Sequence, residues 1–306
     1  MQTIHSPDKD EDENSALVVI GNYRYSRQAH EAGLAILASG HSYWVYASEE
    51  GYALAVPREH AQQLRREVEI AEIKNHYWPP PSLGLPDKKI SKVPTAVAVV
   101  LLIATFAAQN EFPFLKELGM NSSVGVAQNG EWWRIVTAIT LHADISHLSG
   151  NLLSISVFGY LCCRYMGSGL AWLLILLAAS MANLTNVLLR LDEAFFSLGA
   201  STAAFAALGL LTGFPIGTYL RSQEPMTTRD WLIPFFGGCV LFAWLGGGDF
   251  PTDVAGHLWS FAYGLALSII VSWISLYAKI SKQLQGGLLG LNSIILVGAW
   301  GLALTY

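Results

Sequence analysis

The sequence predicts an all-α polytopic membrane protein, preceded by a small α/β soluble domain of βαββα order. Three observations lead to this fold class. Apolar residues make up 52% of the 306 positions and charged residues only 13%, against about 25% charged in soluble domains. From residue 91 onward the apolar residues come in long blocks. Residues 16–76 instead show the short alternating patterns of a soluble unit.

The soluble part begins after an acidic tail, residues 1–15, which we expect to be disordered and not a signal peptide. Gly40 and the turn at 49–51 separate the periodic stretches that follow. The expected elements are a strand over 16–20, a helix over 26–38, two hairpin strands over 42–47 and 52–56, and a helix from 57 to about 73.

Residues 16–76 therefore predict a small cytosolic domain that carries no motif with a recognisable chemistry. A regulatory or partner-binding role for this domain is a hypothesis, and its partner is unknown. A linker over 77–92 follows, made stiff by Pro79, Pro80 and Pro81.

Hydrophobic blocks of membrane-spanning length fill the rest of the chain, since about 20 apolar residues cross a bilayer as a helix. We expect a six-helix core over 93–276, and a loop with a seventh helix over 277–306. The candidate spans cover 93–109, 147–166, 169–189, 199–219, 231–246, 254–276 and 286–304.

The Lys and Arg residues of the connecting segments predict the orientation, because cytoplasmic loops carry an excess of them. With the N-terminal domain inside, the outer segments hold few basic residues and the C-terminus lies outside. The inner segments then carry Lys88, Lys89, Lys92, Arg164, Arg221, Arg229, Lys279 and Lys282, and the outer segments only Lys116, Arg134 and Arg190.

Two residues that can share a proton lie just inside apolar spans, Ser201 and His257. An ionisable residue at membrane depth marks a functional site by default, and a serine becomes a nucleophile when a base accepts its proton. With this orientation both residues lie at the outer ends of their helices. Phe205, one turn after Ser201, is placed to stack against His257. The pair predicts a protease that cuts peptide bonds within the membrane.

Candidate oxyanion donors lie in the segment 142–151, where His147 and Asn151 share one helix face. The backbone N–H of Ser201 is a third candidate. Each feature alone also fits a structural role: an interhelical hydrogen bond for Ser201, a buried structural histidine for His257, and a polar helix cap for the segment 142–151. Close contact of the two helices is indicated by small residues, namely Gly199, Ala203 and Gly209 on one, and Ser260 and Gly264 on the other.

Taken together, these residues resemble the rhomboid family of intramembrane serine proteases over about 93–276. Trp133-Arg134 is similar to the family's pair in the first loop, and His142, His147 and Asn151 match its H-x₄-H-x₃-N pattern. The G-x-S helix of the family is matched by Gly199 and Ser201 with Phe205 and Gly209, and its later histidine by His257. The resemblance implies a rhomboid-like six-helix bundle, with the extra helix of a "6+1" layout.

The resemblance also implies roles. Ser201 would be the nucleophile, His257 the general base and then acid, and His147 and Asn151 the oxyanion stabilisers. Substrates would be single-pass transmembrane proteins, cut near the outer face of the bilayer at small residues next to helix-breaking sequence. We expect residence in the plasma membrane of a bacterium, and no cofactor or metal. The supporting residues would be Gly199, Phe205, Gly209, Trp133, Arg134, His142 and Gly264.

Departures from the family pattern are Gly256 before the histidine, where alanine is expected, Ser260 in place of a glycine, and Phe205 where many members have tyrosine. We expect Ser260 to loosen the helix contact slightly. The alternative function is a non-catalytic rhomboid-like protein that binds transmembrane clients.

Other classes of protein fit less well. Gly246 to Asp249 match the G-x-G-D of aspartyl intramembrane proteases, but we place them in an outer loop. A transporter should show internal repeats, and the sequence shows none that we recognise. No basic tract suggests nucleic acid. We expect neither a disulfide nor a metal site from Cys162, Cys163 and Cys239.

Overall fold

The structure is a computed structural model, and it describes all residues except 1–15, 50, 76–84, 224–231, 233–235 and 238–252. The chain divides into two compact units, Met1–Pro81 and Ser82–Tyr306, each treated by itself below. The expected acidic tail, half of the linker, Cys239 and the G-x-G-D segment lie outside the described residues.

The N-terminal unit has the expected βαββα order. Its antiparallel sheet has the strand order β1-β3-β2, in which Leu54 pairs with Gly21 on one side and Val45 on the other. Ile36 and Leu64 of the two helices pack with Leu54 in a buried core. The elements are β1 (Leu17–Tyr23), α1 (Ser26–Ala38), β2 (Trp44–Ser48), β3 (Gly51–Pro57), a 3₁₀ turn (Arg58–His60) and α2 (Ala61–Asn75).

The second unit contains, among the described residues, six helices long and apolar enough to cross a membrane. They match six of the seven candidate spans within a few residues, and the other, 231–246, falls almost wholly outside the described residues. The spanning helices are α3 (Val93–Glu111), a helix over Ile145–Met166, α9 (Ser168–Leu188), α10 (Ser201–Ser222), α12 (Val254–Trp273) and α14 (Lys282–Thr305).

The helix over Ile145–Met166 is built from α7 (Ile145–Ser154), a π-helical turn (Ile155–Gly159) and α8 (Tyr160–Met166). Short elements fill the connections between the spanning helices. One of them, β5, pairs antiparallel with β4, and this pairing joins the first long loop to the segment before α10. These elements are α4 (Phe114–Gly119), β4 (Asn121–Ser122), α5 (Ser123–Ala127), α6 (Arg134–Thr137), a 3₁₀ turn (Ala138–Thr140), β5 (Phe196–Ser197) and α13 (Leu276–Lys279).

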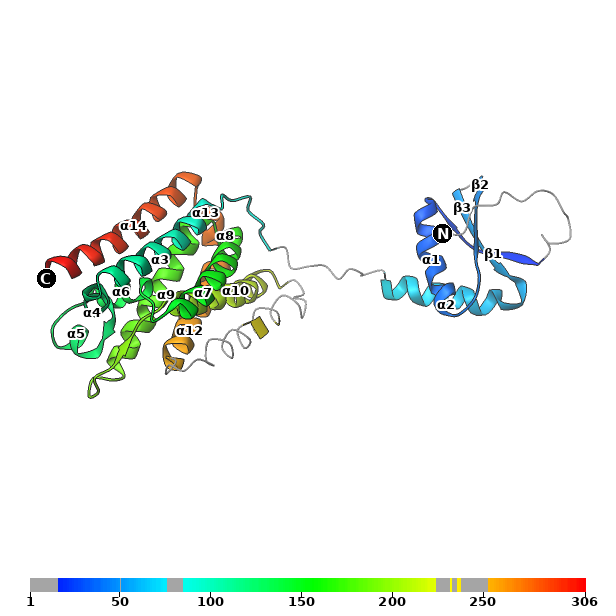
Figure 1. The fold of residues 1–306 in the computed structure, drawn as a ribbon. Coiled ribbons are helices and arrows are strands. Elements are labelled where there is room, and N and C mark those ends of the chain that lie inside the picture. Colours follow the sequence, from blue (N-terminus) through cyan, green and yellow to red (C-terminus); the bar gives the residue numbers. More distant parts are fainter. Residues whose placement is uncertain (1–15, 50, 76–84, 224–231, 233–235, 238–252) are drawn as a thin grey trace. The chain divides into compact units, whose positions relative to one another are not determined.

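The centre of the bundle is α10, the most buried of the spanning helices, which packs along α12 (Figure 1). Glycines let the two backbones touch. A Cβ at Gly209 would lie 2.9 Å from the backbone nitrogen of Leu265, and one at Gly264 would lie 3.0 Å from the carbonyl carbon of Ala206. The beginnings of α10 and α12, which carry Ser201 and His257, are therefore held next to each other.

The last helix, α14, is tied to the bundle at both ends. Near its start, the Gln285 side chain donates to the Met166 carbonyl at 2.9 Å and accepts from the Leu170 amide at 3.0 Å. Near its end, Trp300 Nε1 donates to Thr140 Oγ1 at 3.1 Å. The seventh helix thus supports the segment that leads to His142.

Candidate active site

Ser201 and His257 lie within hydrogen-bond distance, with 2.8 Å between Oγ and Nε2. Ser201 is the first residue of α10, and His257 lies in the first turn of α12. Both are buried, with exposed fractions of 6% and 4%. The imidazole nitrogen faces the hydroxyl in the arrangement that a nucleophile and its base require.

The Phe205 ring stacks on His257, with 4.4 Å between the ring centroids and 19° between the ring planes. Phe205 is 3% exposed and lies one turn after Ser201 on α10. The stack covers one face of the imidazole and so limits the orientation of the ring.

Gly199 lies between His147 and Ser201. Its φ of +137° favours glycine, and a Cβ built there would lie 2.6 Å from His147 Cε1. The same Cβ would be 2.8 Å from His147 Nε2 and 3.5 Å from Ser201 Oγ. Glycine at this position therefore lets the His147 ring lie against the backbone that leads to Ser201.

Asn151 lies one turn after His147 on α7 and is completely buried. Neither its side-chain nitrogen nor its oxygen has a hydrogen-bond partner among the described residues. Asp144 begins the helix by accepting from the His147 amide at 2.8 Å. A buried amide without a partner is costly, so the Asn151 side chain calls for an explanation beyond packing.

His142 supports the segment before Ser201, because its Nε2 accepts from the Ala200 amide at 3.4 Å. Its ring packs edge-on against that of His147, with 5.4 Å between centroids. The backbone of His142 is bound in turn by the Gln109 side chain at the end of α3. Burial, together with the nearby His147, lowers the pKa of His142 to about 3, so the ring is neutral at pH 7.

Arg134 and Trp133 hold the first long loop together, away from the dyad. Arg134 forms an ion pair with Glu131, and its Nη1 donates to the carbonyls of Glu117 at 2.6 Å and Met120 at 3.0 Å. The Trp133 ring packs against Tyr306 at the end of α14, with 4.9 Å between centroids. Arg134 thus joins distant parts of the loop, and Trp133 joins the loop to the end of α14.

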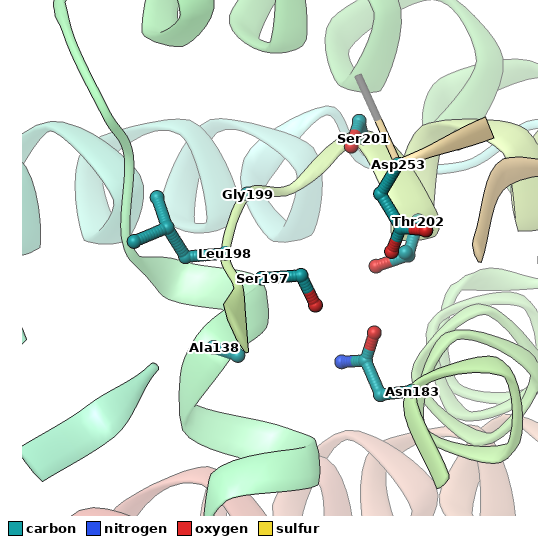
Figure 2. Close-up of a pocket in the computed structure, with 8 residues that line it drawn as sticks. All are labelled: Ala138, Asn183, Ser197, Leu198, Gly199, Ser201, Thr202 and Asp253. Carbon is teal, nitrogen blue, oxygen red and sulfur yellow. The ribbon is translucent and has the colours of Figure 1, made fainter. Parts of the chain in front are cut away.

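A small polar cavity lies beside Ser201. Figure 2 shows the side chains of Asn183, Ser197, Thr202 and Asp253 around one small space, with a cavity volume of about 10 Å³. Asn183 also ties α9 to the loop by donating to the Ile135 carbonyl at 2.8 Å. A water molecule could reach the dyad through such a space.

Four residues of this region were not singled out from the sequence: Gln109, Asn183, Asn186 and Asp253. Three of them are buried polar side chains inside predicted spans, and the rule that flagged His257 could have flagged them. Ser260, the departure from the glycine pattern, is fully buried, and its hydroxyl donates to the His257 carbonyl at 3.0 Å.

Cys162 and Cys163 are buried free thiols. Within the described part of the chain, no three His, Cys, Asp or Glu residues come together as metal ligands.

Comparison with known proteins gives the site a family context. The family model described as "Rhomboid domain" matches residues 129–274, which include every candidate catalytic and oxyanion residue. The Rhomboid protease GluP of Bacillus subtilis is 31% identical over 150 residues, covering 49% of this chain and 27% of that protein. YdcA of the same bacterium is 38% identical over 89 residues, 29% of this chain and 43% of that protein.

Rhomboid-like protease 3 of Toxoplasma gondii is 27% identical over 183 residues, 59% of this chain and 68% of the relative. The chain therefore spans less than half the length of the two Bacillus relatives. The matched domain, the relatives and the bundle of membrane-spanning helices agree on one family. Over residues 129–274 the chain is therefore similar to the rhomboid family.

Proposed function

We propose that this chain is an active intramembrane serine endopeptidase, with Ser201 as nucleophile and His257 as general base. The observation that carries the proposal is the 2.8 Å contact between Ser201 Oγ and His257 Nε2, buried at the start of two packed helices. A non-catalytic client-binding protein would have no need to keep this contact.

The first half of the reaction forms an acyl-enzyme. Ser201 Oγ attacks the scissile carbonyl carbon while His257 Nε2 takes the hydroxyl proton, and the carbonyl oxygen becomes an oxyanion. His147 and Asn151 donate to the oxyanion, together with the Ser201 N–H, which as the first amide of α10 has no acceptor within the helix. The protonated His257 then gives its proton to the leaving amine as the C–N bond breaks.

The second half releases the other product. A water molecule from the polar cavity attacks the acyl carbon, His257 takes one of its protons, and the oxyanion re-forms at the same donors. Collapse of this intermediate breaks the bond to Ser201 Oγ, which regains its proton from His257. The side chains of the dyad end in their starting protonation states.

The substrates we propose are single-pass transmembrane proteins in the lipid bilayer. The site lies where α7, α10 and α12 begin, and therefore at one end of the bundle. The uneven distribution of Lys and Arg assigns this end to the outer face, with the N-terminus in the cytoplasm of a bacterium. Helix-breaking sequence near the cleavage point would expose the scissile carbonyl, because a carbonyl within a regular helix is shielded by its own hydrogen bonds. Small residues at the cleavage point are what the resemblance to the rhomboid family implies.

Purified protein in liposomes with a single-pass model substrate tests the proposal. We expect cleavage by wild type and its loss in both Ser201→Ala and His257→Ala. Ser149→Ala, which removes an exposed serine of α7, and His41→Ala in the N-terminal unit are the matched controls and should cleave normally. Folded wild-type protein that binds the substrate without cutting it would instead support the client-binding alternative.

A further inference from the structure

The side chain of Asp253 is bound on both of its oxygens at the start of α12. Oδ1 accepts from the Gly256 amide at 2.9 Å and so caps the helix. Oδ2 accepts from Asn186 Nδ2 at 2.6 Å, and Asn186 belongs to α9. The cap of the helix that carries His257 is therefore attached to a different helix.

Asn186 is completely buried, and both ends of its amide are used. Its Oδ1 accepts from Arg190 Nη1 at 2.7 Å, while its Nδ2 donates to Asp253. The Arg190 guanidinium lies over the Phe195 ring, 4.4 Å from the centroid. The Arg190 cation is thereby linked to the partly buried Asp253 carboxylate through one amide.

Gly256 makes this arrangement possible. A Cβ at Gly256 would lie 2.7 Å from Asn186 Nδ2 and 2.8 Å from Asp253 Cγ, closer than real Cβ contacts. The rhomboid pattern has alanine at this position. In this chain the glycine leaves the space that the Asn186 side chain needs.

His257 lies four residues after Asp253, and its amide donates to the Asp253 carbonyl at 3.1 Å. The first turn of a helix has the fewest hydrogen bonds of its own, so its geometry depends on the cap. A displacement of the backbone in this first turn would move the imidazole as well, because His257 is part of the turn.

We propose that Asp253 and Asn186 are positioning residues, which hold the first turn of α12 so that His257 Nε2 stays at Ser201 Oγ. The kinetic part of this inference rests on the proposed function, whereas the structural part does not. Neither residue touches the reacting atoms.

Exchanging the two side chains provides the sharpest test. In Asp253→Asn the new amide can still cap α12, but it turns an NH₂ group toward the NH₂ of Asn186. In Asn186→Asp two carboxylates face each other. The double variant Asn186→Asp/Asp253→Asn restores complementary partners, because residue 186 then accepts both from Arg190 and from the new amide.

Each single variant is expected to lower kcat by about 10- to 100-fold with KM unchanged, since small misplacements of a catalytic group have costs of this size. The double variant is expected to return kcat close to the wild-type value. Hydrogen exchange of the amides in 254–257 should be faster in the single variants and normal in the double variant, whether or not a substrate is cleaved.

The matched control is Tyr263→Phe, which removes a 2.8 Å hydrogen bond to Thr185 between the same two helices, deeper in the bundle. It is expected to lower the melting temperature and leave kcat unchanged. A double variant no better than the weaker single variant would overturn the proposal, as would single variants with wild-type kcat and exchange.

If a single variant does not fold, the double variant decides the matter: wild-type kcat supports the proposal, and a failure to fold overturns it. If wild-type protein cleaves nothing, the proposed function fails, and the exchange pattern alone decides the positioning role.

Discussion

Gln109 of α3 binds the backbone of His142 on both sides: its Nε2 donates to the His142 carbonyl at 2.5 Å, and its Oε1 accepts from the His142 amide at 3.0 Å. All of these groups are buried. His142 in turn accepts from the amide of Ala200, the residue before Ser201. The first spanning helix is thereby connected to the candidate nucleophile through two side chains.

Gln109→Leu should destabilise the protein, because it leaves two buried backbone groups of His142 without partners, at about 1–3 kcal/mol for each group. Cleavage should also fall, since His142 supports the segment before Ser201. Thermal unfolding in detergent measures the first effect. Asn110→Ala, at the exposed neighbouring position, is the control, and equal melting temperatures for the two variants would contradict this role of Gln109.

The low pKa of His142 predicts a loss of stability in acid. Burial and the nearby His147 bring this pKa to about 3, whereas the unfolded chain binds the proton below about 6.5. The contribution of the neutral His142 ring to the free energy of unfolding is complete above pH 6.5. This contribution is lost as the pH falls toward 3, by at most about 1.4 kcal/mol per pH unit. We expect His142→Gln to reduce the acid sensitivity of the unfolding free energy. If the free energy of unfolding falls equally with pH in the variant and in wild type between pH 7.5 and 4.5, this role of His142 is contradicted.

Phe205→Leu should lower kcat with little change in KM, because it removes the ring that stacks on His257. Aromatic stacking contributes about 0.5–1.5 kcal/mol, which corresponds to roughly a two- to tenfold loss in rate. Phe205→Tyr keeps the ring and should stay near wild type. Steady-state kinetics on the model substrate separate the two variants, and equal values of kcat would show that the stack does not orient the base.

Arg134→Ala should harm folding more than chemistry. The guanidinium binds the carbonyls of Glu117 and Met120 and pairs with Glu131, and none of these partners is catalytic. Removing this partly buried guanidinium, which binds two carbonyls and a carboxylate, should have a cost of about 1.5–3 kcal/mol. The expected result is a lower melting temperature, with normal cleavage by the fraction that remains folded. Purified Arg134→Ala protein with normal thermal stability but no activity would show that this role is wrong.

The sequence predicts those parts of the fold whose length and apolar pattern are set by water or by the bilayer. A bilayer fixes how long an apolar helix must be, so six candidate spans agree with helices of the structure within a few residues. The N-terminal helix expected over 26–38 is found as Ser26–Ala38, because Gly40 and the strand pattern limit it on both sides. The short elements of the first loop were not predicted, since contacts with α9 and α14 determine them.

The sequence predicts the residues of the candidate site, but it does not predict the hydrogen bonds that hold those residues in place. Ser201, His257 and Phe205 can be paired because each sits at a known depth and on a known helix face. The bonds from Gln109 to His142 and from Asn186 to Asp253 join positions far apart in the chain, and only the packing of the helices brings them together. The catalytic roles of all these residues stay predictions.

The most direct measurement of the central claim is labelling of purified protein with a fluorophosphonate, followed by mapping of the modified peptide by mass spectrometry. The phosphonyl group reacts only with a serine that a base activates. We expect a single adduct on Ser201 in wild type, no adduct in Ser201→Ala, and strongly slowed labelling in His257→Ala. A folded wild-type protein that stays unlabelled, or that labels equally fast without His257, would contradict the Ser201–His257 dyad.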